Sequence, residues 1–257
     1  MNPPLHITSR ANPLLVRLRR LAHDGAGYRR AGQVWLEGDH LCQALRASGR
    51  PAVQAVVSQA AWELPALREL ARWAPHVAVV PGALFASFSA LDSPAGIGFL
   101  LDLPAAAALA PGLPTVVLDR VQDPGNVGSI LRSAAAFGVR QVLALAGTAA
   151  LWSPKVLRAG MGAHFALGLH EGLDETALQV LVVPLLATSS HAGQSLPDAP
   201  LPWPCAWVMG HEGQGVSTTL LARCALQLRI PQPGGEESLN VAAAAAVCLY
   251  ESQRRLQ

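Results

Sequence analysis

A series of short, unbroken apolar runs in the second half of the chain constrains the fold more than any other feature. The clearest run is Val180-Leu181-Val182-Val183. A run without polar alternation suits a strand buried on both faces, and such strands belong to parallel sheets covered by helices. The pattern predicts an α/β domain with strands at 115–118, 141–145, 180–187, 205–209 and 225–230. Helices are expected between them, at 127–137, 154–160, 217–222 and 238–254.

The composition changes most clearly at 101–114, LDLPAAAALAPGLP, where three prolines bracket an alanine-rich segment. Such a stretch is typical of a link between two domains. We therefore predict a smaller N-terminal α/β domain over 1–104, a linker over 105–114 and the parallel-sheet domain over 115–257. The first domain should contain strands at 34–38, 53–57, 77–80 and 97–101. Its helices should lie around 14–21, at 39–47 with Asp39 as the cap, and at 64–73.

Composition excludes several classes of protein. Hydrophobic residues make up 51% of the chain and charged residues 14%, which argues against global disorder. No stretch approaches the roughly 20 apolar residues of a membrane span, and the first residues lack the pattern of a secretory signal, so we expect a cytoplasmic protein. The four cysteines form no CxxC pair and have no histidine at ligand spacing, so neither a metal site nor a disulfide framework is expected.

Positive charge is concentrated at the N-terminus. Residues 1–50 contain eight arginines and three acidic residues, a balance of +5, whereas the whole chain carries +2. A basic region of this kind indicates an RNA or DNA partner. Solvated surface arginines are the alternative for any one of them. The candidates for phosphate contact are Arg10, Arg17, Arg19, Arg20, Arg29 and Arg30.

Three loops follow predicted strands of the second domain, at the edge where parallel sheets bind ligands. The first, after Leu118, contains Asp-Pro-Gly-Asn, in which Asn126 could cap the next helix and Gly138 could end it. Turn and cap roles explain most of this segment. The turn and cap roles do not account for Arg132, which lies close to the N-terminus of the helix, where anions are favoured. An ordinary surface arginine is the alternative.

The second and third loops are also compatible with plain turns. The second, Gly210-His211-Glu212-Gly213-Gln214-Gly215, is neither the G-x-G-x-x-G dinucleotide fingerprint nor a P-loop. Glu212 could be a solvated loop carboxylate. The third runs from Ile230 to Val241, with Ser238 as a plausible helix cap before a run of alanines. Taken alone, each loop is weak evidence for a function.

In this order, however, the three loops resemble a known family. The patterns N-x-G-x-x-x-R-[ST]-A-x-x-F-G, G-x-E-x-x-G and I-P-x-x-G-x-x-x-S-L-N-V are filled at 126–138, 210–215 and 230–241. They are the motif set of the SpoU (TrmH) class of RNA ribose 2′-O-methyltransferases, within the SPOUT superfamily. Many members have serine after the last motif, where this chain has Ala242. Asn12-Pro13, Arg29-Arg30 and Leu36-Glu37-Gly38 look like the family's L30e-like substrate-binding module.

The resemblance implies a parallel-sheet domain with a trefoil knot, a homodimer, S-adenosylmethionine as cofactor and RNA as substrate. Among RNAs, the separate N-terminal domain favours 23S-type ribosomal RNA over transfer RNA. Matching by position, the cofactor should contact Gly210, Ile230 and Leu239, with Thr188 as a weaker candidate. The residues expected to hold the ribose and support the reaction are Asn126, Arg132, Glu212, Ser238 and Asn240.

The reaction implied is attack of a ribose 2′-hydroxyl on the methyl group of the cofactor, accelerated mainly by alignment. Arg132 matches an arginine proposed as base, but a guanidinium stays protonated in proteins. We therefore expect Arg132 to clamp the phosphate or ribose and stabilise developing charge. Whether Glu212 or solvent takes the proton stays open. The rivals are a transfer RNA methyltransferase, an inactive RNA-binding or assembly protein and, less favoured, a nicotinamide-dependent dehydrogenase.

Overall fold

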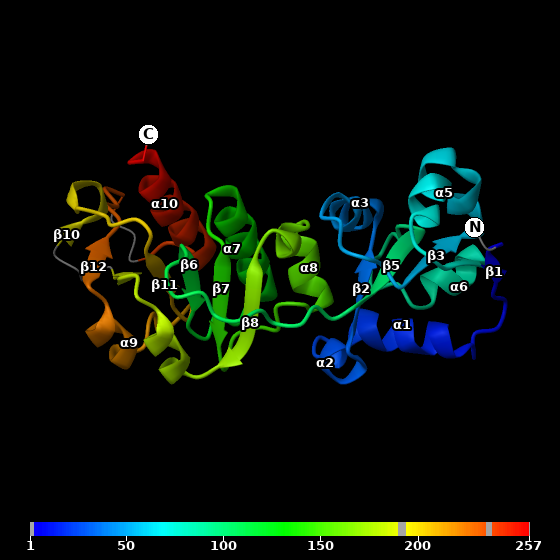
Figure 1. Cartoon of the computed structure of the whole chain (residues 1–257), viewed down its shortest axis with the longest axis horizontal. Helices are drawn as coiled ribbons and strands as arrows, with labels where there is room; N and C mark the ends of the chain where they lie inside the picture. The colour runs from blue at the N-terminus through cyan, green and yellow to red at the C-terminus, as the bar shows by residue number, and fades with distance from the viewer. Residues whose placement is uncertain (1–2, 190–193, 235–237, 257) are drawn as a thin grey trace. The chain divides into compact units, whose positions relative to one another are not determined.

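The computed structural model describes residues 3–189, 194–234 and 238–256, so positions 235–237 of the third motif loop lie outside the described residues. The chain divides into two compact units, each with its own sheet (Figure 1). Unit 1 comprises Met1–Ala105 and Trp152–Phe165, and unit 2 comprises Ala106–Leu151 and Ala166–Gln257. In the described part of the chain, no helix is both long and apolar enough to cross a membrane.

Unit 1 is an α/β domain around a five-stranded mixed sheet, in the order β1-β4-β3-β5-β2. The predicted strands are confirmed, and the short β1 is added at one edge by parallel pairing with β4. β3 runs parallel to β4 but antiparallel to β5. The strands are β1 (Leu5–His6), β2 (Gln33–Glu37), β3 (Gln54–Ser58), β4 (Val77–Val80) and β5 (Ile97–Asp102).

The helices of unit 1 include the three that were predicted and three short ones that were not. The expected cap of α3 is wrong: Gly38 is the N-cap and Asp39 is the first helical residue. A segment from later in the chain, α8 (Pro154–Gly160), also belongs to this unit and contacts α1 and β2. The remaining helices are α1 (Pro13–His23), α2 (Gly27–Ala31), α3 (Asp39–Ala47), α4 (Gln59–Glu63), α5 (Pro65–Arg72) and α6 (Gly82–Ala86).

Unit 2 is built on a seven-stranded sheet in the order β10-β12-β9-β11-β6-β7-β8, and every neighbouring pair is parallel. The predicted parallel-sheet class is therefore confirmed. β8 and β10 were not predicted from the sequence. The strands are β6 (Thr115–Leu118), β7 (Gln141–Leu145), β8 (Gly168–Leu173), β9 (Leu185–Thr188), β10 (Gln194–Ser195), β11 (Ala206–Met209) and β12 (Leu226–Arg229).

The prediction of a strand over 180–187 is wrong in its first half. A 3₁₀ helix, η2 (Glu175–Val180), ends there, and β9 begins only at Leu185. Pro184 lies inside the predicted run, and proline has no N–H to donate to a sheet ladder. The apolar run is also partly exposed, since Val182 keeps 79% of its surface accessible. The run therefore approaches the sheet as irregular chain.

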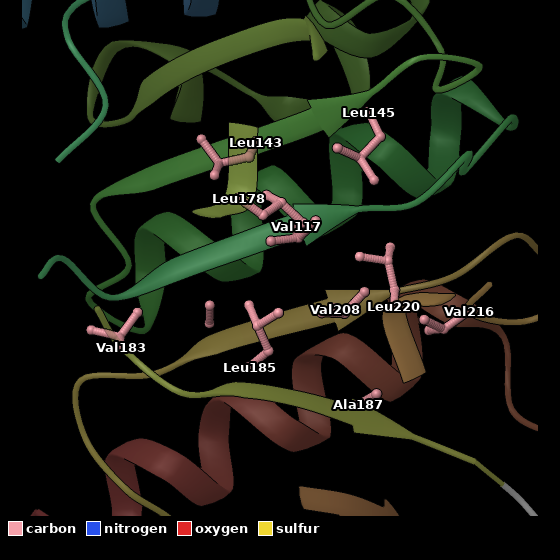
Figure 2. Packing of buried hydrophobic residues seen from close by; sticks show 11 residues of the cluster. Val117, Leu143, Leu145, Leu178, Val183, Leu185, Ala187, Val208, Val216 and Leu220 are labelled. Carbon is pink, nitrogen blue, oxygen red and sulfur yellow. The ribbon is translucent and has the colours of Figure 1, made fainter. Parts of the chain in front are cut away.

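Helical segments cover both faces of this sheet. On one face, η2 and α9 (Thr218–Arg223) join a buried cluster that includes Val117, Leu143 and Val208 (Figure 2). Side chains alternate along a strand, so Trp207 points to the other face, where its Nε1 donates to Ser252 of α10 (Val241–Arg254) at 3.0 Å. There α10 packs against α7 (Pro124–Ala136). These layers leave the carboxyl ends of the strands to the loops.

Candidate active site at the carboxyl ends of the strands

The three motif loops all begin at the carboxyl ends of the parallel strands, on the same side of the sheet. β6 and β11 are hydrogen-bonded neighbours with Leu118 opposite Met209, so the first and second loops begin side by side. β9 lies between β11 and β12. The candidate cofactor residues Thr188, Gly210 and Ile230 therefore end or follow three adjacent strands. The sheet order thus gathers residues that are far apart in the sequence.

The second loop, 210–215, folds back on itself. His211 and Gly215 exchange two backbone hydrogen bonds of 3.0 and 2.8 Å. A Cβ atom at Gly210 would lie only 2.2 Å from the backbone of Gly215, so this position requires glycine. Inside the turn, His211 Nδ1 accepts hydrogen bonds from the N–H groups of Gly213 at 3.0 Å and Gln214 at 3.2 Å. The turn is therefore closed by its own groups, which leaves Glu212 to bind the first loop.

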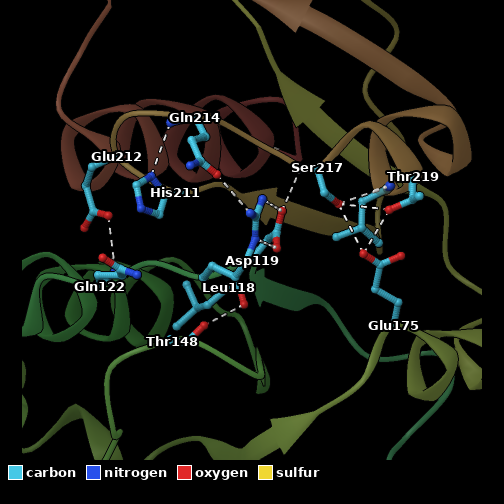
Figure 3. A network of polar contacts seen from close by, with 12 residues as sticks. Leu118, Asp119, Gln122, Thr148, Glu175, His211, Glu212, Gln214, Ser217 and Thr219 are labelled. Atoms are coloured by element: carbon cyan, nitrogen blue, oxygen red, sulfur yellow. Dashed lines mark hydrogen bonds and ion pairs between the residues drawn. The ribbon is translucent and has the colours of Figure 1, made fainter.

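Glu212 connects the second loop to the first (Figure 3). Its carboxylate accepts hydrogen bonds from Gln122 N at 3.1 Å, Asp123 N at 3.0 Å and Asn126 Nδ2 at 3.1 Å. Burial acts to raise the pKa of Glu212, but these hydrogen bonds favour the charged form and lower the pKa from 4.5 to about 2. Glu212 is thus an ionised acceptor that fixes the start of α7.

Asn126 continues this link into the third loop. Its Oδ1 accepts a hydrogen bond of 2.9 Å from Asn240 Nδ2, while its own Nδ2 donates to Glu212. Asn240 Oδ1 in turn accepts from the N–H groups of Ala242 and Ala243 at 2.9 and 3.2 Å. Hydrogen bonds therefore run from the start of α10 through Asn240 and Asn126 to Glu212. This relay joins one residue of each motif, although 114 positions separate the two asparagines.

Two predicted helix caps are wrong, and the corrections explain why both asparagine side chains serve the relay. Asp123, not Asn126, caps α7, because its carboxylate accepts from Asn126 N at 2.8 Å. Asn240, not Ser238, caps α10. The sequence signal for the first correction was Pro124, since an Asp-Pro pair is typical of a cap followed by the first helical position. Gly138, at φ +77°, ends α7 as expected.

The remaining two ribose candidates, Arg132 and Ser238, are exposed and separate from the relay. Arg132 lies six positions after Asn126 on α7, and no described residue hydrogen bonds to its guanidinium. No described contact joins Arg132 to Glu212, although both are candidate ribose residues. Ser238 likewise has no hydrogen bond to a described residue.

The third loop offers apolar and polar groups to a cofactor. Leu239 keeps 39% of its surface exposed, and Ile230 is half-buried. Gln232 was not singled out from the sequence, yet its Oε1 is buried and receives no hydrogen bond from the described residues. An unsatisfied buried acceptor calls for a donor. Within the described chain, no group of three or more acidic, histidine and cysteine residues could hold a metal ion.

The structure separates the six candidate arginines of unit 1 into different settings. Three of these arginines, Arg17, Arg20 and Arg30, line a groove of about 1030 Å³ beside α1 and α2. Arg19 instead donates to Ser87, and Arg29 packs over the ring of Tyr28. Arg10 is exposed outside the groove lining. The groove also contains carboxylates, so its positive charge is moderate.

The parallel sheet and its three linked loops define the class as a SPOUT-type RNA methyltransferase, with the motif residues at the strand ends. The chain belongs to the SpoU rRNA Methylase family, whose model matches residues 114–250. The predicted family is therefore confirmed.

Relatives and solved structures agree with this family. An uncharacterized tRNA/rRNA methyltransferase of Synechocystis sp. is 36% identical over 97% of this chain and 93% of its own length. The 23S rRNA (guanosine-2′-O-)-methyltransferase RlmB of Bordetella pertussis is 37% identical over 73% of this chain and 74% of its own. The crystal structure of an AdoMet-bound rRNA methyltransferase from Sinorhizobium meliloti matches with a TM-score of 0.86, at 25% identity over 98% of both chains.

Proposed function

We propose that this protein transfers a methyl group from S-adenosylmethionine to a ribose 2′-hydroxyl of RNA, and that the RNA is 23S ribosomal RNA. The observation that carries the proposal is the relay from Asn240 through Asn126 to Glu212, which joins all three family motifs. RlmB, a relative over most of its length, is named for guanosine 2′-O-methylation of 23S rRNA. A chain that had lost catalysis would be free to lose these contacts, and they are intact.

The residues at the strand ends fit S-adenosylmethionine, which supplies the methyl group. Thr188, Gly210, Ile230 and Leu239 would hold it, with apolar side chains packing around the purine and backbone groups binding its polar edge. The Oε1 of Gln232 is buried and receives no hydrogen bond from any described residue. It supports this fit, because the purine carries an amino group that donates hydrogen bonds.

The ribose would be held by Arg132, Ser238 and the relay. Arg132 is exposed and permanently charged, so it can clamp a substrate phosphate or ribose and stabilise negative charge that develops on the 2′-oxygen. Asn126 and Asn240 are held by fixed hydrogen bonds, so they can orient the sugar without reorganising. The roles of all five residues are proposals that rest on this geometry.

RNA outside the reacting nucleotide would bind unit 1. Arg17, Arg20 and Arg30 line one groove, and the guanidinium group of arginine can bind phosphate oxygens through two parallel hydrogen bonds. Arg10, Arg19 and Arg29 are weaker candidates, because Arg19 and Arg29 already contact Ser87 and Tyr28. In this proposal, the N-terminal domain binds the substrate and the C-terminal domain carries out the chemistry.

Four further features belong to the same proposal. We infer a trefoil knot near the C-terminus, an L30e-like N-terminal domain and a cytoplasmic location, where ribosomal RNA is found. We also infer a homodimer. Tyr250 and Val247 support it, since both are exposed apolar residues of α10 that a second copy would cover.

The test is transfer of labelled methyl groups from S-adenosylmethionine to unmodified transcripts of 23S rRNA and transfer RNA. We expect incorporation into the 23S transcript, followed by mapping of one 2′-O-methylated nucleotide that disappears from cells lacking the gene. Incorporation only into transfer RNA would overturn the ribosomal assignment. No incorporation into either, with intact S-adenosylmethionine binding, would overturn the enzymatic function.

A further inference from the structure

Asp119 is a buried carboxylate at the end of β6 that the reaction described above does not use. It is only 2% exposed, and it is the first residue of the first motif loop. Its two oxygens accept hydrogen bonds from Arg120 Nε at 2.8 Å and Arg120 Nη2 at 3.2 Å, which form a bidentate pair. Asp119 Oδ2 also accepts a hydrogen bond of 2.7 Å from Ser217 N, two residues after the second motif loop. The carboxylate therefore binds both loops.

Arg120 extends this contact to two further points. Its Nη1 donates to Gln214 Oε1 at 3.1 Å, inside the second motif loop (Figure 3). Its side-chain carbons lie against Gly147, where an added Cβ would be 3.2 Å from Arg120 Cγ. Arg120 thus touches the loops after β6, β7 and β11. A single side chain therefore links the loop after β7 to the two loops that Glu212 also joins.

The backbone at Arg120 is unusual. Its φ of +59° lies in the left-handed region, which residues with a Cβ rarely adopt. Such conformations persist where the surrounding contacts over-determine them, and they gather at functional sites. At Arg120, the hydrogen bonds to Asp119 and Gln214 are the contacts that hold the left-handed backbone conformation. A solvated surface ion pair would need neither the strain nor a buried partner.

The pair holds the second loop at residues that follow Glu212. Arg120 and Asp119 hold Gln214 and Ser217, whereas Glu212, earlier in the same loop, holds the amides of the first loop. Without the hydrogen bonds from Arg120 to Gln214 and from Ser217 to Asp119, the second loop could move. Such a movement would carry Glu212 away from Asn126. We infer that Asp119 and Arg120 are positioning residues for methyl transfer, an assignment that rests on the proposed function. They fix the second loop so that the relay keeps its geometry.

Two substitutions test this positioning role. Arg120→Met removes the guanidinium but keeps the side-chain carbons over Gly147. Gln214→Leu leaves the ion pair between Asp119 and Arg120 intact and removes only the hydrogen bond from Arg120 to Gln214. This variant therefore stays informative if Arg120→Met fails to fold. Gln214→Glu retains an acceptor for Arg120 and is the rescue variant. Arg254→Met is the matched control, because Arg254 also forms a bidentate pair, with Glu251 in α10.

The measurements are kcat and KM with the unmodified 23S rRNA transcript, together with amide hydrogen exchange. Misplacing reacting groups by a small distance costs on the order of tenfold to a hundredfold in rate. We expect Gln214→Leu and Arg120→Met to lower kcat by about tenfold or more, with KM for S-adenosylmethionine unchanged. Gln214→Glu and Arg254→Met should keep the wild-type kcat. Exchange at Gln122 and Asp123 should accelerate in the first two variants only.

Unchanged kcat and unchanged exchange in Gln214→Leu would overturn the inference, as would failure of Gln214→Glu to restore the rate. The exchange experiment needs no substrate, so it separates this inference from the proposed function. If the wild-type protein transferred no methyl group to RNA while Gln214→Leu still released the amides of Gln122 and Asp123, the proposed function would fail. The structural coupling would then be supported without its catalytic role.

Discussion

Replacing Glu212 by glutamine should destabilise the protein at neutral pH and progressively less in acid. Hydrogen bonds lower the pKa of the Glu212 carboxyl from 4.5 to about 2 in the folded protein. The folded state therefore favours the charged form, and the stabilisation is present above pH 4.5 and lost as the pH falls toward 2. A glutamine side chain at this position would lack the charge, and its NH₂ group would face an N–H donor.

The size of the effect follows from this change in pKa. A lowering from 4.5 to about 2 corresponds to at most about 3.4 kcal/mol. Glu212 is largely exposed, however, so water competes for the same donors and screens the charge. We therefore expect a loss of about 1 kcal/mol for Glu212→Gln at pH 7. For a domain of this size, such a loss lowers the melting temperature by roughly 2–4 °C.

The assay is thermal unfolding of wild-type and Glu212→Gln protein between pH 7 and pH 3. Glu251→Gln is the control, because hydrogen bonds from Arg254, together with Arg255, also lower the pKa of Glu251 to about 2. Both variants should lose stability at pH 7 and approach wild-type at pH 3. Only Glu212→Gln should also lose methyl transfer. A melting-temperature difference for Glu212→Gln that stayed constant with pH would refute the reasoning.

Three further predictions follow from the candidate site. Arg132→Ala should abolish methyl transfer and leave S-adenosylmethionine binding by calorimetry intact; loss of cofactor binding, or a substantial residual rate, would contradict the clamp role. Asn240→Asp should keep the cap of α10 and hence the melting temperature, but should lower kcat because it cannot donate to Asn126, whereas Asn240→Ala should also cost about 1 kcal/mol of stability; equal stability of the two would argue against the cap. Replacing Arg17, Arg20 and Arg30 together by glutamine should weaken RNA binding and flatten the slope of log affinity against log salt by roughly 2, and an unchanged slope would remove the groove from the binding surface.

Much of the fold could be predicted because its signals are local. The strands 77–80 and 141–145 and the helices 39–47 and 154–160 have the bounds expected from apolar patterning and turn residues. β8 was missed because glycines at both 168 and 172 and a charged residue at 171 interrupt its apolar pattern. The segment 152–165 joins unit 1 through packing against α1 and β2. Tertiary contacts of this kind leave no mark in a single sequence.

The candidate site likewise contains residues that could be predicted from the sequence and residues that could not. The motifs identified Asn126, Glu212 and Asn240, and the structure brings these three together. Asp119 and Arg120 could not be found from the sequence, because an Asp-Arg pair after a strand is indistinguishable from a solvated surface pair. What distinguishes them is the burial of Asp119 and the positive φ of Arg120. Both properties depend on loops that only the completed sheet places side by side.

The structure also bears on where the proton of the 2′-hydroxyl goes. Glu212 has a pKa of about 2, and both of its oxygens already accept hydrogen bonds, so it is far too weak a base near neutral pH. The guanidinium of Arg132 has hydrogen-bond donors and no acceptor, and the amides of Asn126 and Asn240 are neutral donors and acceptors. These residues can align the hydroxyl and stabilise its developing charge, but none can hold the proton. We therefore propose that the side chains of the candidate ribose residues supply geometry and electrostatics, and that the proton passes to water.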